Sequence, residues 1–249
     1  MVFRGQSNSV WTVKSTLERS GVSAIPLKKF YTSIDYLKPE INSLGHNFQR
    51  KISDGEYDFD FTGRNQIDFD KFPDLEYLTY LRHHGFPTPL IDVTQSEYVA
   101  LFFACEDLNE KTDAKVFVFR GDLGEMRGTG IPELHRIGHY LESDRRHIAQ
   151  QSEYLVTVQF QRREDYSEWA FIPFSSFMEE ENTLINDADS DAVDEKKTMY
   201  EIEIDGNAKK NIMAELAKMN INHYTLYLDE DSLVQKLKYE CLRKMLPGS

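Results

Sequence analysis

The segment from His83 to Ala104 constrains the fold of this chain more than any other. It opens with the loop HHGFPTP, in which each proline fixes its own φ and pushes the preceding residue out of the helical region. The following LIDVT alternates in polarity as a short strand does. Ser96 can then cap a helix whose apolar face carries Val99 and Phe102. The segment therefore predicts a stiff loop, a strand and a buried helix in direct succession.

Length and composition limit the class of protein. With 249 residues, of which 40% are hydrophobic, the chain can bury a sizeable core as one domain or slightly more. A formal net charge of -13 disfavours broad electrostatic binding to nucleic acid or anionic membrane, although a small basic cleft is compatible with it. No run approaches the roughly 20 apolar residues of a membrane span, and the N-terminus lacks the apolar core of a signal peptide. We therefore expect a cytoplasmic protein without membrane association.

The two cysteines, Cys105 and Cys241, indicate reduced thiols. They have no histidines at metal-ligand spacing, so no metal site is expected.

The second half of the chain divides around an acidic stretch. Residues 179–197 are poor in apolar side chains and predict a mobile loop, with docking of a basic partner such as a cognate antitoxin as the alternative. The loop would separate a core over residues 1–178 from a C-terminal β-α-β-α element over residues 198–249. In that element we expect strands at 200–204 and 224–228, and the whole is too small to stand alone, so it should pack on the core.

Several polar side chains have both a functional and a structural interpretation. Arg4 precedes a glycine in an apolar strand and can grip a phosphate in a bidentate way, or pair with a core acid such as Asp92. His83 and His84 can carry out acid–base work, or stabilise the C-terminus of the preceding helix. A hydrolase that uses Asp92 with one of these histidines would need a metal, which no ligand spacing supports.

The triplet Gln151-Ser152-Glu153 lies at the start of a predicted strand. Gln151 and Glu153 are two residues apart and should face the same side. An amide and a carboxylate so placed can bind a ribose and stabilise positive charge at a sugar carbon. The alternative is an exposed strand edge with two polar residues. Arg145 and Arg146, just before, can hold phosphates or balance local acids.

Together these segments resemble the FRG domain family, which is named for the tripeptide present here as Phe3-Arg4-Gly5. The matching positions continue through Gln6, Trp11, Leu17 and Arg19, and then His83–Thr88, Leu90–Asp92, Thr94, Ala100–Ala104 and Ile148–Gln151. Two positions depart from the family pattern: Pro89 stands where arginine is frequent, and Val93 where tryptophan is frequent.

FRG domains look like relatives of ADP-ribosyltransferases, so the resemblance implies an α+β fold with a split antiparallel sheet and flanking helices. Such enzymes place three strand motifs around NAD. Arg4 matches the first motif, Thr94 the second with Ser96 as a rival, and Glu153 the third. The resemblance therefore implies Arg4, Thr94 and Glu153 as catalytic residues.

The resemblance also implies a set of binding residues. Gln151 would orient the acceptor, and the NAD site would be lined by Arg4, Gln6, His83, His84, Thr88, Asp92, Ser96, Arg146 and Gln150. The function implied is that of an NAD-dependent ADP-ribosyltransferase in a bacterial toxin or phage-defence context. Its acceptor would be a protein, a nucleic acid or water, and NAD would be a substrate. The alternative is a non-catalytic nucleotide- or partner-binding module that kept the fold.

Overall fold

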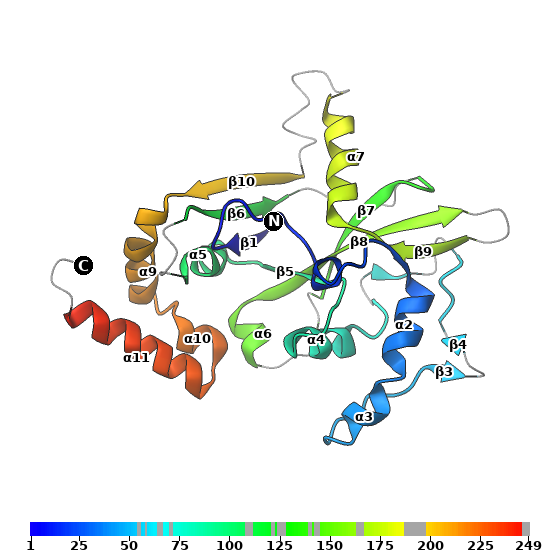
Figure 1. The fold of residues 1–249 in the computed structure, drawn as a ribbon, viewed down its shortest axis with the longest axis horizontal. Coiled ribbons are helices and arrows are strands. Elements are labelled where there is room, and N and C mark those ends of the chain that lie inside the picture. Colours follow the sequence, from blue (N-terminus) through cyan, green and yellow to red (C-terminus); the bar gives the residue numbers. More distant parts are fainter. Residues whose placement is uncertain are drawn as a thin grey trace.

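The described strands of the computed structural model form one eight-stranded antiparallel sheet with helices packed around it, which confirms the predicted α+β class (Figure 1). The described residues are 1–53, 56–57, 59–63, 67–69, 72–107, 112–120, 123, 128–138, 141, 145–162, 167–186 and 198–245. The main-sheet strands are β1 (Val2–Gln6), β2 (Ile25–Pro26), β5 (Ile91–Thr94), β6 (Ala114–Phe119), β7 (Pro132–Ile137), β8 (Ser152–Arg162), β9 (Ser167–Phe171) and β10 (Met199–Ile204). A separate hairpin pairs β3 (Ile52–Ser53) with β4 (Glu56–Tyr57).

The order of the strands is β10-β6-β1-β5-β8-β9-β2, and β7 also pairs with β8. β1 and β6 are paired along the full length of β1, but β1 and β5 share only the pair Phe3–Thr94. Strands joined at one residue pair separate on either side of it. The sheet therefore consists of two halves, and the opening between them positions the candidate site.

The helices follow the apolar patterns of the sequence. They are α1 (Thr16–Arg19), α2 (Leu27–Asp35), α3 (Lys38–Asn42), α4 (Leu75–His83), α5 (Glu97–Cys105), α6 (Arg145–Ala149), α7 (Phe174–Asn186), α9 (Lys209–Lys218), α10 (His223–Tyr227) and α11 (Glu230–Met245), with a 3-10 turn η3 (Gly206–Ala208). Among the described helices, none has both the length and the apolar character needed to cross a bilayer.

Period-two alternation distributes the side chains of β6 between two apolar clusters. Val116 packs with the cluster of α5 and α9, whereas its neighbour Phe117 packs with the cluster of α7 on the other face. α5 begins at Ser96, whose hydroxyl accepts a hydrogen bond from Val99 N at 3.3 Å, as the sequence predicts. A Cβ at Gly5 would lie 1.9 Å from Ala100 O, so only glycine lets β1 approach α5 this closely.

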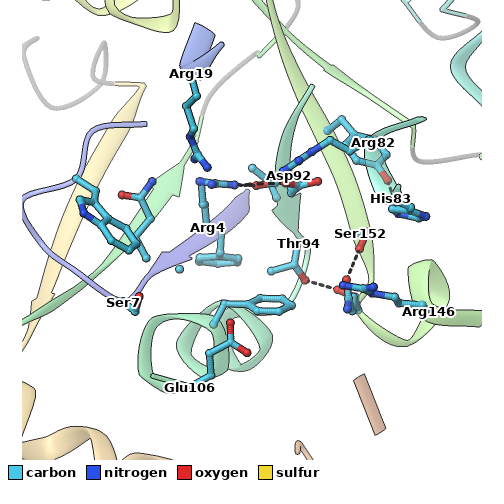
Figure 2. A pocket seen from close by; sticks show the side chains of 18 residues that line it. Arg4, Ser7, Arg19, Arg82, His83, Asp92, Thr94, Glu106, Arg146 and Ser152 are labelled. Carbon is cyan, nitrogen blue, oxygen red and sulfur yellow. Dashed lines mark hydrogen bonds and ion pairs between the residues drawn. The ribbon is translucent and has the colours of Figure 1, made fainter. Parts of the chain in front are cut away.

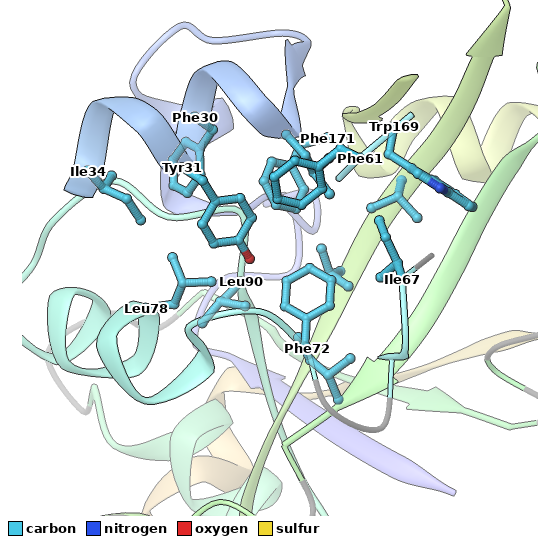
Figure 3. Packing of buried hydrophobic residues seen from close by; sticks show 14 of the residues in the cluster. Phe30, Tyr31, Ile34, Phe61, Ile67, Phe72, Leu78, Leu90, Trp169 and Phe171 are labelled. Atoms are coloured by element: carbon cyan, nitrogen blue, oxygen red, sulfur yellow. The ribbon is translucent and has the colours of Figure 1, made fainter. Parts of the chain in front are cut away.

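The largest apolar cluster lies beneath α2 and α4, against β8 and β9 (Figure 3). Tyr31 of α2 stacks on Phe61 with ring centres 5.3 Å apart, and its hydroxyl donates to Pro73 O at 2.8 Å. Phe72 and Phe171 complete this group of rings. This packing anchors α4, whose last turn lines the candidate site.

The C-terminal element joins the main sheet through β10, which pairs with β6 from Met199–Phe119 to Ile204–Ala114. The predicted strand at 224–228 is wrong, since these residues largely form α10. Asn222 and Thr225 cap that helix reciprocally, at 3.2 and 3.1 Å. The element is therefore β-α-α-α rather than β-α-β-α.

The acidic stretch also differs from its prediction. Residues 179–186 are not a loop but the second half of α7. This helix is anchored by Phe174 and Phe177, which are buried against β6 and β8. Residues 187–197 lie outside the described residues.

Candidate functional site

A cavity of about 350 Å³ opens where β1 and β5 separate (Figure 2). Side chains from β1, α1, α4, β5, α5, α6 and β8 line it. It brings together seven of the residues expected at an NAD site, namely Arg4, Gln6, His83, Asp92, Thr94, Arg146 and Gln150. These positions come from three distant parts of the chain, so their convergence is a property of the fold.

The lining of the cavity is basic although the protein is acidic. It contains four arginines and two carboxylates, which gives a formal charge of +2 inside a chain of charge -13. A concave surface whose net charge has one sign concentrates ligands of the opposite sign. The cavity is thus suited to an anion.

Two of these arginines meet on one carboxylate. Arg4 Nη1 donates to Asp92 O at 2.7 Å and lies 3.8 Å from Asp92 Oδ2, and Arg82 Nη2 donates to the same Oδ2. Burial lowers the pKa of Arg4 to about 10. The negative charge of Asp92 acts against this shift, and the positive charges of Arg19 and Arg82 add to it. Arg4 therefore stays charged at neutral pH. Burial acts to raise the pKa of Asp92, but Arg82 and Arg4 outweigh it and hold that pKa below 3.8.

The two guanidinium groups keep unused donors. Among the described residues, the buried Nε atoms of Arg4 and Arg82 have no hydrogen-bond partner. A buried donor without a partner costs free energy. An anionic ligand that draws these guanidinium groups toward itself would provide one.

Thr94 and Gln150 connect the cavity to the rest of the chain. Thr94 Oγ1 donates to Gln150 O at 2.7 Å and accepts from Ser96 N at 3.1 Å. Gln150 Nε2 in turn donates to Leu226 O at 3.0 Å, in α10. Thr94 therefore fixes the end of β5 against the turn after α6.

Glu153 does not lie with Arg4 and Thr94, which corrects the expectation from the sequence. Ser152 and Tyr154 line the cavity, and Glu153 between them points to the opposite face of β8. Its carboxylate is 1% exposed and accepts from Arg136 and Gln95. A carboxylate enclosed in this way has no access to a ligand in the cavity.

Four other predicted residues also lie outside the lining. Ser96 caps α5, and Thr88 is buried in a hydrogen-bonded pair with Thr16. His84 ends α4 beside the ring of Tyr80. Gln151 is exposed in the turn before β8 with a φ of 47°, so it does not share the alternation of the strand.

The sequence interpretation missed Glu106, which directly follows α5 and lines the cavity. Tyr227 donates to Glu106 Oε2 at 2.9 Å, and the Arg146 guanidinium lies 4.6 Å from the centre of the Tyr227 ring. Burial raises the pKa of Glu106 above 4.5, against the lowering effects of Tyr227 and Arg146. The position of Glu106 at the end of a predicted buried helix could have indicated it from the sequence. Its contact with Tyr227, 121 residues away, could not be predicted in this way.

Tyr154 and Arg82 were missed as well. The Tyr154 hydroxyl lies 3.4 Å from His83 Nε2 and 3.4 Å from His147 Nδ1. Arg82 immediately precedes the histidine pair, and only the packing of α4 against β5 shows that it reaches Asp92. Within the part of the chain that the structure describes, no group of three or more histidine, cysteine or acidic side chains is arranged to hold a metal ion.

Comparisons with known proteins identify one family. The FRG domain model matches residues 1–113, which include β1, α4, β5 and α5 with Arg4, Arg82, Asp92 and Glu106. No curated protein and no solved structure matches the chain. The remaining lining residues, from α6 and β8, lie beyond the matched segment. Residues 1–113 of this chain therefore match the FRG domain family.

Proposed function

We propose that the cavity binds NAD and that the protein is an ADP-ribosyltransferase-like toxin or defence effector, which transfers ADP-ribose to a macromolecular acceptor or to water. The observation that carries this proposal is the convergence of Arg4 and Arg82 in a basic cavity at the opening of the sheet. Its volume of about 350 Å³ lies within the range of small-molecule sites.

The donor set fits a diphosphate. A guanidinium presents paired N–H groups that match the oxygens of a phosphate, and charge-assisted hydrogen bonds of this kind are strong. Arg4 and Arg82 already hold one carboxylate between them, so their spacing suits a second group of similar size and charge. Arg19 lines the same cavity and adds positive charge near Arg4.

The reaction would break the bond between the ribose C1′ and the nicotinamide nitrogen, which takes the electron pair and leaves as neutral nicotinamide. The acceptor atom then bonds to C1′ and gives up a proton. Positive charge develops on the ribose, and a nearby carboxylate stabilises it. We assign this role to Glu106, because it faces the cavity whereas Glu153 does not.

A non-catalytic nucleotide-binding module is the second candidate. One observation favours it: the carboxylate of the third motif, Glu153, is enclosed by Arg136 and Gln95. A chain that kept the arginine cavity and lost the reacting carboxylate would bind the nucleotide without turnover.

Calorimetry with ADP-ribose tests binding, and release of labelled nicotinamide from NAD tests turnover. We expect Arg4→Lys to weaken binding by at least about tenfold, because lysine cannot form the bidentate contact. Arg162→Lys, at an exposed arginine outside the cavity, is the matched control. Glu106→Gln should bind ADP-ribose and release no nicotinamide.

The outcomes separate the two candidates. Binding without nicotinamide release by the wild-type protein, in the presence of cell lysate as a source of acceptors, would favour the binding module. Absence of ADP-ribose binding would overturn both.

A further inference from the structure

A second hollow of about 410 Å³ adjoins the arginine cavity. It lies against the loop between β1 and α1 and is lined by Gln6, Val10, Trp11, Thr12, Lys14 and Arg19. Three of these side chains, Gln6, Trp11 and Arg19, also line the first cavity. The two hollows therefore share a border, at which Arg19 stands beside Arg4 (Figure 2).

The second hollow combines an accessible aromatic ring with two cations. Trp11 is 51% exposed, in contrast to the fully buried Trp169. Lys14 and Arg19 lie in the same lining, and Arg19 Nη2 donates to Lys14 O at 3.2 Å. Aromatic rings beside basic groups bind nucleotides, because the ring stacks on a base while the cations attract phosphate.

The loop that carries Trp11 is held in place. Trp11 N donates to Asn8 O at 3.3 Å, Val10 N donates to Asn8 Oδ1 at 3.0 Å, and Ser9 N donates to Asp113 O at 2.7 Å. An indole presented on a fixed loop loses little freedom when it binds a ligand.

Gln6 provides a second, independent indication. It is only 5% exposed, and its Oε1 has no hydrogen-bond partner among the described residues. Gln6 lies on the border of both hollows, where its amide suits a ribose hydroxyl or an amino group of a base.

We propose that the second hollow is a base-stacking subsite, in which Trp11 stacks on the adenine of a dinucleotide whose diphosphate lies against Arg4 and Arg82. The inference rests on the proposed function, because it requires a nucleoside diphosphate in the arginine cavity. It adds that the ligand spans both hollows, and it distinguishes a dinucleotide from a simple phosphate ester.

Tryptophan fluorescence tests the subsite directly, because the chain has two tryptophans and Trp169 is buried. We expect saturable quenching of the wild-type protein by ADP-ribose and none by ribose 5-phosphate, which has no base. Trp11→Leu should abolish the quenching and weaken ADP-ribose binding by about tenfold or more in calorimetry. Trp11→Phe should recover part of the affinity. Tyr98→Leu, at an exposed aromatic outside both hollows, is the control.

The failure of this inference differs from the failure of the proposed function. Unchanged ADP-ribose affinity in Trp11→Leu, with binding still sensitive to Arg4→Lys, overturns the subsite and leaves the arginine cavity standing. Quenching by a short single-stranded oligonucleotide but not by ADP-ribose assigns Trp11 to an acceptor and overturns the dinucleotide assignment. Absence of ADP-ribose binding by the wild-type protein overturns both proposals.

Discussion

Two arginine–carboxylate clusters lie on opposite faces of the same pair of strands, and they differ in access. Val93 of β5 pairs with Glu153 of β8, so Asp92 and Glu153 point to opposite faces. Asp92, with Arg4 and Arg82, has a side chain that is 41% exposed and borders the cavity. Glu153, with Arg136 and Gln95, is 1% exposed.

The comparison shows that an arginine–carboxylate cluster can serve stability or ligand binding, depending on whether a ligand can reach it. The enclosed cluster places the charge of Glu153 against that of Arg136, and losing one partner would leave the other poorly compensated. The open cluster keeps donors without partners in the described residues, so a ligand can still engage them. The enclosed cluster should therefore govern stability and the open one binding.

We expect the largest effect on stability from a substitution in the enclosed cluster. Glu153→Gln should lower the free energy of unfolding by about 1.5–3 kcal/mol, because the charge-assisted hydrogen bonds between the buried carboxylate and Arg136 are lost, while Arg136 itself is partly exposed. Urea unfolding measures this loss. ADP-ribose affinity should be unchanged at temperatures where the variant is folded. A variant with normal stability and lost nicotinamide release would instead restore Glu153 as the reacting carboxylate.

The next largest effect is a loss of ADP-ribose binding when the open cluster is changed. Arg82→Gln should weaken ADP-ribose binding by about tenfold or more, since a charge-assisted hydrogen bond contributes about 1.5–3 kcal/mol. Its stability should change by less than about 1 kcal/mol, because the partner Asp92 is partly exposed. Calorimetry and urea unfolding on one preparation provide both numbers, with Arg162→Gln as control. Equal losses in both measurements would contradict the comparison.

The pH dependence of stability tests the role of Asp92. Because Arg82 and Arg4 hold its folded pKa below 3.8, its ionised form stabilises the fold above that pH, and the contribution is lost as pH falls through the lower folded value. Asp92→Asn should therefore be less stable than wild type at neutral pH, and the gap should close below pH 3.8. Thermal melting across pH checks this, and a gap that widens in acid would contradict it.

A substitution of Glu106 should have the smallest effect on stability, and it should stabilise the fold at neutral pH, whereas the substitution of Asp92 destabilises it. Burial raises its folded pKa above 4.5, so ionisation at neutral pH costs stability. Glu106→Gln should melt slightly higher than wild type at pH 7, and the difference should vanish as pH falls below 4.5.

Tyr227→Phe removes a hydrogen bond that lowers the pKa of Glu106, so a ¹³C NMR titration should find that pKa higher still.

Local pattern in the sequence was sufficient for much of the fold. The cap at Ser96, the strand before it and the apolar helix after it were predicted from neighbouring residues. Arg4, Asp92 and Thr94 of the FRG segments line one cavity, whereas Glu153 does not. These features depend on backbone geometry over a few residues, which each segment specifies by itself.

Only the tertiary structure decided which face each polar side chain occupies and which distant groups meet. Alternation along β8 separates Glu153 from Tyr154, but its phase relative to the cavity depends on pairing with β5 and β7. The contact between Glu106 and Tyr227 joins residues 121 positions apart. A single strand has two equivalent faces, and nothing in its own residues states which of them the rest of the chain will cover.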